Sequence, residues 1–352
     1  RTDVRVCNLS YLQTDWYVNQ MKSQAYESDP LPISMEELQY GNKKREYAYI
    51  LDRVDYPVSV KMAMDYFLSD DERTKTIPGY GKINHLPTGE LFIDIDKEKI
   101  LKSGIVPKGY ENKIVDRIDL SFKDKNTLIL NDLAIIDLLS TNAETGWKRP
   151  VYFATTVDPS FFTETDKYFM RTGMAYEVVP VKLENTPGRY QVNTDKMYDN
   201  VMNKFVWGGI DVNPDIYLDE TIRRMCYSYR IMFIDLIDQL IQEGKTDKAL
   251  KALDYCMEKI PGDVVPHNYI SLQLAMDYYF LKQNEKGKAL LEKIADSAIE
   301  YVTWINSLDN NKKRSVQRDY YYNERALAEQ VIPMFYRFGD EESGKKYLEK
   351  AA

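Results

Sequence analysis

The sequence predicts an α/β domain followed by an all-helical domain, with the boundary near residue 210. Two observations indicate this arrangement. In residues 1–210, short strand-like and helix-like segments alternate, an order that places helices against a mixed, at least partly parallel sheet. In residues 211–352 the strand-like pattern disappears, and apolar residues recur with helical spacing over long segments. The second domain is therefore predicted to consist of packed helix pairs.

Composition narrows the classes of function. The 352 residues include 44% hydrophobic and 29% charged residues, which is typical of a globular protein. The net charge of −8 argues against nucleic acid as a partner, because such binding needs clustered Lys and Arg. Three cysteines without a CxxC spacing predict neither a disulfide framework nor a zinc site. The 28 tyrosines suit interfaces and sugar-binding surfaces, although a general preference for Tyr explains the count as well.

Strands of the first domain are expected where polar and apolar residues alternate. Residues 4–9 show this alternation from the start of the chain. Similar patterns predict further strands at 91–95, 115–122, 150–156 and 173–182.

Helices of the first domain are marked by their end residues. Thr14 is the expected N-cap of a helix over 16–23, and Asp15 suits its positive N-terminal end. Ser34 opens a stretch with capping-box spacing and predicts a short helix, while Gly104 ends another. Helical spacing predicts the remaining helices at 58–68, 97–102 and 127–140.

The second domain contains a recurring turn. Gly244 is followed five residues later by the small residue Ala249, then by Leu253, and the segment ends at Pro261. This spacing matches the second half of a tetratricopeptide repeat, in which one helix pair packs on the next. Residues 224–243 supply the preceding helix.

The same spacing recurs twice with weaker signals. Asn284 is followed by Ala289, and Gly339 by Gly344. The sequence therefore predicts three degenerate tetratricopeptide-like helix pairs, with an insertion at 309–313. Three aromatic residues are candidates for contacting a partner in the groove of the repeats, with core packing as the alternative: Tyr278, Tyr279 and Tyr321.

Motifs for catalysis are weak. Asp94 and Asp96 form a D-x-D triplet, the spacing with which many glycosyltransferases hold a divalent cation, but a solvated strand face explains it as well. No G-x-S-x-G elbow supports a Ser-His-Asp triad through His85. The sequence thus predicts no catalytic residue and no cofactor, and Asp94 and Asp96 remain weak candidates for a metal site.

Asp15 and Trp16 follow the first expected strand, where ligand crevices of open α/β sheets form. A Trp beside a carboxylate can act as a platform for a sugar ring. The alternative is that Trp16 packs into the core and Asp15 only serves the helix end.

Five motifs occur in the same order as in a known family. They are DVRVCNLSYLQTDWY, KRPVYFA, GMAYEVVP, FVWGG and the helical stretch at 217–230. Through them the chain resembles a family of bacterial multi-pass membrane proteins of unknown function. That family is similar to the protein O-mannosyltransferases of the GT-C superfamily.

The resemblance implies a soluble extracytoplasmic portion that follows a block of membrane helices and an acidic segment. Neither of these matches residues of this sequence. We therefore expect the chain to be part of a longer protein, cut just before its first strand. The resemblance further implies a periplasmic location, tethered to the inner membrane, and a reaction centre in the missing region.

The leading hypothesis is a non-catalytic accessory domain of a membrane glycosyltransferase-like protein. It would lie against its own membrane-embedded N-terminal region and bind an acceptor polypeptide or another envelope protein. The candidate contacts are Asn8, Thr14, Asp15, Trp16 and Arg149.

Two alternatives belong to other classes. One is a protein-interaction module of the tetratricopeptide type, unrelated to glycosyl transfer. The other is a stand-alone hydrolase or transferase that uses Asp94, Asp96 or His85, which requires these side chains to share a compact pocket.

Overall fold

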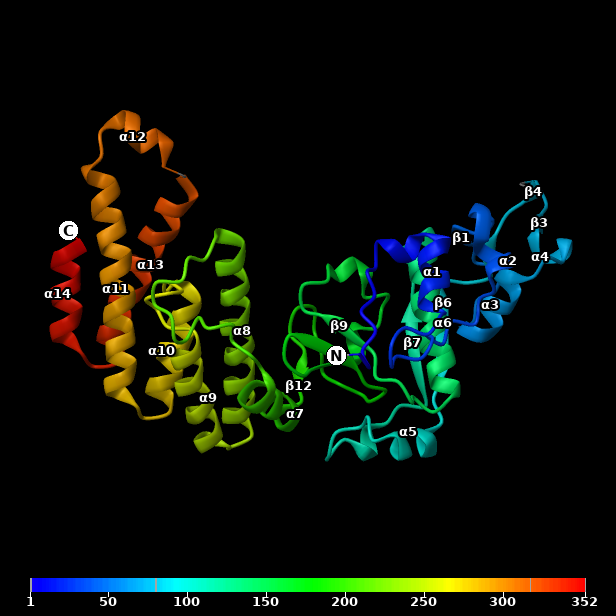
Figure 1. Ribbon diagram of the computed structural model, residues 1–352, viewed down its shortest axis with the longest axis horizontal. Coiled ribbons are helices and arrows are strands. Elements are labelled where there is room, and N and C mark those ends of the chain that lie inside the picture. Colours follow the sequence, from blue (N-terminus) through cyan, green and yellow to red (C-terminus); the bar gives the residue numbers. More distant parts are fainter. Residues whose placement is uncertain (1, 80, 317, 352) are drawn as a thin grey trace. The chain divides into compact units, whose positions relative to one another are not determined.

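The computed structural model describes residues 2–79, 81–316 and 318–351, with side chains for all of these except 315 and 318–322 (Figure 1). This chain divides into two compact units. The first unit comprises Arg1–Arg171 and Ala175–Asn193, and the second comprises Thr172–Met174 and Thr194–Ala352. The predicted boundary at 210 lies inside the second unit.

Small mixed sheets form the β-structure of the first unit. Their strand orders are β5-β1-β8, β12-β10-β11-β9, β2-β6-β7 and β3-β4. Parallel pairing joins β1 to β5, β2 to β6 and β10 to β12, while the other neighbours are antiparallel. The predicted mixed, partly parallel β-structure is therefore confirmed, divided among several sheets. The strands are β1 (Tyr47–Ile50), β2 (Val58–Ser59), β3 (Thr76–Ile77), β4 (Gly81–Lys82), β5 (His85–Leu86), β6 (Glu90–Asp94), β7 (Arg117–Ser121), β8 (Thr127–Ile129), β9 (Tyr152–Ala154), β10 (Phe169–Arg171), β11 (Ala175–Val178) and β12 (Gln191–Val192).

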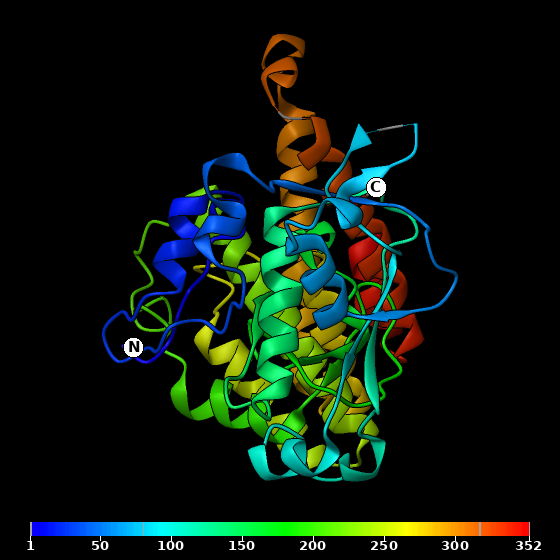
Figure 2. The same ribbon diagram turned by 90° about the vertical axis from the view of Figure 1, so that its right-hand side faces the viewer.

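A buried helix, α6, forms the centre of the first unit. It packs against α3 and strands β6 and β8, and Figure 2 shows it upright with α3 beside it. Twelve of its 15 residues are buried, among them the polar residues Asn131, Asp137 and Asn142. The helices of this unit are α1 (Asp15–Met21), α2 (Glu37–Tyr40), α3 (Val60–Leu68), α4 (Glu72–Lys75), α5 (Lys97–Ser103) and α6 (Leu130–Glu144).

Most predicted elements of this unit are confirmed, with shifted ends. The helix expected at 58–68 begins at Val60, and Gly104 ends α5 in the left-handed conformation. The capping box of α2 consists of Glu36 and Gln39 instead of starting at Ser34. The segment expected to be helical from 127 begins as strand β8.

The strand predicted at 4–9 is wrong. This segment is irregular and pairs with no strand in the described chain. The Arg5 guanidinium donates instead to the carbonyl oxygens of Gln20 and Ser23, and the Asn8 N–H donates to the Tyr17 hydroxyl. The segment is therefore held against α1 by side-chain hydrogen bonds, which alternation alone does not predict.

The second unit is helical, as predicted. Helix α8 packs against α7, α9 and α10, α10 packs against α11, and α11 packs against α13 and α14. The predicted insertion at 309–313 coincides with the start of α12, which Asp309 caps by accepting N–H donors at 2.9 and 3.0 Å. The helices are α7 (Thr194–Asp199), α8 (Glu220–Gln242), α9 (Thr246–Lys259), α10 (Tyr269–Phe280), α11 (Asn284–Ser307), α12 (Asn310–Ser315), α13 (Arg318–Arg337) and α14 (Glu341–Ala351).

Three of these helices begin after the same kind of turn. Gly244, Lys282 and Gly339 all have positive φ, between 62° and 82°. Five residues after each lies a buried small residue, in turn Ala249, Gly287 and Gly344. A Cβ on Gly287 would lie 2.7 Å from the Tyr279 ring, and one on Gly344 would lie 2.5 Å from the Tyr336 ring.

The middle turn was predicted at the wrong position. The expected pair Asn284 and Ala289 lies two residues beyond the actual pair, Lys282 and Gly287. A lysine occupies the left-handed position that glycine takes in the other two turns, so the usual marker is absent. In the described part of the chain, no helix is both long enough and apolar enough to cross a membrane.

Candidate functional site

Four of the predicted contact residues lie around the start of α1. The Asn8 Oδ1 accepts the Tyr11 N–H at 3.2 Å, and the Thr14 hydroxyl donates to the Tyr11 carbonyl at 2.7 Å. Thr14 is the N-cap by backbone conformation, but its side chain bonds no helix N–H. Asp15 accepts N–H donors from Trp16 at 2.8 Å and Asn42 at 3.1 Å. These polar groups are largely used to hold the helix start in place.

Trp16 belongs to an exposed aromatic cluster, which we define as Tyr11, Trp16 and Tyr17. The Trp16 ring centroid lies 5.9 Å from that of Tyr11 and 5.4 Å from that of Tyr17. Tyr17 is buried, whereas Trp16 is 56% and Tyr11 52% exposed. The buried Tyr17 ring thus supports the two exposed rings through direct contact. Exposed Trp and Tyr side chains are enriched at protein interfaces.

The hydrogen bonds of Arg149 go to other residues than those of this cluster. Its guanidinium donates to the carbonyl oxygens of Asp29 at 2.9 Å and Pro30 at 3.3 Å, and to the Ser28 hydroxyl at 2.5 Å. Its backbone is held by the Asn142 side chain on α6. The residue ties the segment at 28–30 to the end of the central helix.

The residues proposed for catalysis or metal binding have separate partners. Asp94 ends β6 opposite Arg117, and Asp96 caps α5 by accepting the Lys99 N–H at 3.1 Å, which lowers the pKa of Asp96. His85 is buried and lies 2.9 Å from the Tyr66 hydroxyl. The structure therefore does not bring these three side chains into one pocket. No group of three or more metal-ligating side chains occurs in residues 2–79, 81–316 and 318–351.

Two of the predicted groove tyrosines lie inside the helical unit. Tyr278 donates to the Asp254 carboxylate at 2.9 Å, and the Tyr279 ring stacks on Phe338 with centroids 3.8 Å apart. Both are buried, which is the core-packing alternative that the sequence left open for them. The side chain of Tyr321 lies outside the described residues.

Sequence reasoning missed an acidic pocket between α2, α3 and α6. Its volume is about 380 Å³. Its charged lining consists of four carboxylates and one ammonium group, which favours a ligand with a cationic or hydroxyl-bearing group. The charged residues are Glu36, Lys61, Asp65, Asp137 and Glu144.

Asp137 is a buried residue in the lining of the acidic pocket. Its carboxylate accepts the Ser34 N–H and hydroxyl, both at 2.6 Å, and the Met35 N–H at 3.2 Å. Burial raises the pKa of this carboxyl, although the hydrogen bonds act in the opposite direction. An aspartate within an otherwise apolar helical stretch was the available signal, because a buried acid needs partners.

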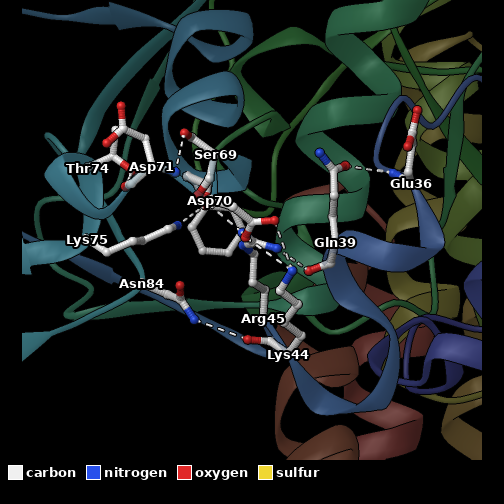
Figure 3. Close-up of polar contacts among 11 residues, drawn as sticks. Glu36, Gln39, Lys44, Arg45, Ser69, Asp70, Asp71, Thr74, Lys75 and Asn84 are labelled. Atoms are coloured by element: carbon white, nitrogen blue, oxygen red, sulfur yellow. Dashed lines mark hydrogen bonds and ion pairs between the residues drawn. The ribbon is translucent and has the colours of Figure 1, made fainter.

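A buried arginine, Arg45, bonds residues that line the acidic pocket, and Figure 3 draws its hydrogen bonds. The Arg45 guanidinium donates to the carbonyl oxygens of Gln39 at 2.8 Å and Ser69 at 3.2 Å, two residues that line the pocket. It also donates to the Asp70 carboxylate at 2.5 Å. Burial, with the Arg45 charge nearby, lowers the pKa of Lys75 to about 8.

Comparison with known proteins identifies the first unit. The model of the family TMEM260-associated domain 2 matches residues 1–196. A search of curated proteins and of solved structures found no match to the chain. Because the family model covers more than half of the 352 residues, the chain belongs to the TMEM260-associated domain 2 family.

Proposed function

We propose that this chain is a non-catalytic, extracytoplasmic accessory part of a membrane glycosyltransferase-like protein, and that it binds an acceptor or partner protein. Membership of a TMEM260-associated family supports the link to a membrane protein. The motifs at 3–17 and 148–154 support the further likeness to GT-C enzymes and a periplasmic location. The protein's own membrane-embedded region is the first expected partner.

The exposed aromatic cluster carries this proposal. About half of the surface of Trp16 and of Tyr11 is exposed, and the buried Tyr17 ring makes edge contacts with both, at centroid distances of 5.4 and 5.6 Å. Aromatic side chains held rigidly in this way lose little conformational entropy on binding, which suits them as anchors of an interface.

The proposal is tested in the bacterial parent protein with its membrane region. The parent gene is deleted, and envelope glycoproteins are compared by mass spectrometry after complementation with the intact gene or with a gene lacking residues 1–352. We expect the deletion to remove specific glycopeptides, and the shortened gene to restore them poorly. Unchanged glycosylation in the deletion strain would contradict the link to glycosyl transfer.

Point variants test the aromatic cluster itself. Trp16→Ala with Tyr11→Ala should weaken acceptor binding and reduce the affected glycopeptides. Tyr26→Ala is the matched control, because Tyr26 is exposed in the same unit and has no ring contact with the cluster among the described residues. Equal effects of the control and the cluster variants would contradict the proposal.

A protein-interaction module of the tetratricopeptide type is the second candidate. The recurring turn with a small residue five positions later supports a repeat array in the second unit. Tyr269 and Phe280, at the two ends of α10, are exposed and could anchor a polypeptide. Partner capture that depends on these two residues, with unchanged glycosylation in the deletion strain, would favour this candidate.

A further inference from the structure

A second pocket, with an aromatic wall, opens beside the sheet β12-β10-β11-β9. We call it the aromatic pocket; its volume is about 620 Å³, within the range of small-molecule sites. Phe162, Tyr176 and Tyr190 form the wall. The Tyr176 and Tyr190 centroids are 4.7 Å apart, and Tyr176 stacks on buried Phe169 at 5.4 Å. The pocket shares no lining residue with the exposed aromatic cluster or the acidic pocket.

The charged groups of the aromatic pocket balance one another. Lys125 and Lys167 supply two ammonium groups, and Glu164 and Asp166 supply two carboxylates. A phosphate ligand would need an excess of positive charge, and a polycation an excess of negative charge. The formal charges of the lining add up to zero, and the lining offers both hydrogen-bond donors and acceptors. This combination suits a neutral ligand whose groups can both donate and accept hydrogen bonds.

The loop that carries Glu164 is strained. Thr163 and Glu164 both have left-handed backbone conformations, with φ of 55° and 59°. Hydrogen bonds from the Thr163 hydroxyl to the Phe161 carbonyl and from the Thr165 hydroxyl to the Phe162 carbonyl hold this loop. Successive non-glycine residues in this conformation are uncommon and concentrate at ligand sites. Burial raises the pKa of Glu164, so its carboxyl is partly shielded from water at the pocket.

A second part of the pocket lining, at 185–190, is held in place by hydrogen bonds. The Asn185 Nδ2 donates to the carbonyl oxygens of Asp166 at 3.0 Å and Phe169 at 2.8 Å. Its Oδ1 accepts the Gln191 N–H at 2.8 Å. These bonds fix the loop that carries Tyr190 before any ligand arrives, which lowers the ordering cost of binding.

We propose that the aromatic pocket binds a neutral saccharide. The Tyr190 ring would contact the C–H face of a pyranose ring, while the carboxylates and ammonium groups would bond its hydroxyl groups. This inference goes beyond the proposed function, which involves a different surface and does not require this pocket.

Saturation-transfer difference NMR on the whole chain tests the inference. The probes are the methyl glycosides of glucose, galactose, mannose and N-acetylglucosamine, with a proline-rich peptide as the competing ligand class. We expect transfer to the ring C–H protons of at least one glycoside. Tyr190→Ala should weaken its binding about tenfold, whereas Tyr190→Phe, which keeps the ring, should change it about twofold.

Two further variants separate binding from folding. Glu164→Gln removes a partly exposed charge without removing packed atoms, and it should weaken binding while leaving the melting temperature near that of the wild type. Tyr49→Ala, on β1 outside the pocket, is the matched control and should not affect binding.

Three results would overturn the inference: no glycoside binds, only the peptide binds, or Tyr190→Ala and Glu164→Gln bind as the wild type does. Each concerns the pocket alone. The glycopeptide profile of the Trp16→Ala and Tyr11→Ala variant tests the proposed function separately, so the failure of one is distinguishable from the failure of the other.

Discussion

Each unit contains an arginine that is almost completely withdrawn from water, and the two arginines have different partners. Arg45, in the first unit, is 2% exposed and donates to two carbonyl oxygens and to the exposed carboxylate of Asp70. Arg230, on α8 in the second unit, is 0% exposed. Its guanidinium donates at 3.1, 2.6 and 2.9 Å to the carbonyl oxygens of Ile260, Val265 and Pro266.

The two arginines show two ways in which a protein compensates a buried charge. Among the residues that the structure describes, no carboxylate is paired with Arg230, and burial lowers the pKa of its guanidinium. Backbone carbonyl dipoles compensate most of its charge, together with the Ser271 hydroxyl at 3.4 Å and the Tyr227 ring, whose centroid lies 5.7 Å from the guanidinium carbon. These carbonyls belong to the segment that joins α9 to α10, so one side chain of α8 holds the segment that leads into α10. Arg45 lies nearer the surface, where a carboxylate can share the charge with water.

Arg230→Met should give the largest loss of stability. It leaves the buried carbonyl oxygens of Ile260 and Val265 and the part-buried one of Pro266 without their donor, so we expect the free energy of unfolding to fall by about 3–4 kcal/mol. Urea denaturation followed by circular dichroism measures this loss. Arg230→Lys, which keeps the charge but not the fork of donors, should recover only part of it. A loss below about 1 kcal/mol would show that water replaces the guanidinium.

Asp277→Asn should give a pH-dependent gain. Asp277 is buried in α10, its Oδ2 has no hydrogen-bond partner, and desolvation raises its pKa to about 7. Because the pKa is higher in the folded chain than the ordinary value of 3.8, the folded chain binds the proton more tightly than the unfolded chain. The stabilising contribution is therefore complete below pH 3.8 and is lost as the pH rises towards 7. The free energy of unfolding of the variant, relative to that of the wild type, should therefore rise by about 2–3 kcal/mol as the pH increases from about 4 to about 7.

The same series of denaturation curves contains its own control. His267 is also buried, and desolvation lowers its pKa to about 3, so it affects stability in acid as well. The contribution of His267 is common to the wild type and Asp277→Asn, and it cancels in their difference. A difference that is independent of pH would show that Asp277 is ionised in the fold.

Arg45→Met should destabilise less than Arg230→Met. We expect a loss of about 1–2 kcal/mol, because the Asp70 carboxylate is already exposed and only two carbonyl oxygens lose their donor. The measurement is the same denaturation assay. A loss equal to that of Arg230→Met would abolish the proposed distinction between the two units.

Asp70→Asn should have the smallest effect. Hydrogen bonds from Lys44 and Arg45 hold the pKa of Asp70 below its ordinary value. The contribution of the carboxylate is therefore present at neutral pH and lost as the pH falls through that lowered pKa. The effect on the melting temperature should be smaller than that of Arg45→Met at pH 7 and should disappear in acid. If the effect on the melting temperature persists in acid, packing of the Asp70 side chain, and not its charge, is responsible for it.

Local signals predicted much of this fold. Gly104 ends α5, Gly244 precedes α9, and alternation located β6 and β7, because each depends on neighbouring residues. The prediction of a strand at 4–9 failed because Arg5 bonds carbonyl oxygens of Gln20, in α1, and Ser23, just after it, which no local pattern reveals.

The candidate sites were less predictable than the fold. The sequence pointed to Trp16, whose exposed ring does belong to a cluster. The acidic pocket combines side chains from α2, α3 and α6, including Glu36, Asp65 and Asp137, which are far apart in the sequence. Their convergence depends on tertiary packing, and the spacing of residues within one element carries no information about it.

The lysine at the middle turn of the helical unit has a consequence for engineering. Lys282 holds a left-handed conformation in which the other two turns use glycine, and it is exposed to solvent. Replacing it with glycine removes a clash of Cβ with the backbone and costs no packed side chain. Lys282→Gly would therefore give the start of α11 the same unstrained turn that precedes α9 and α14.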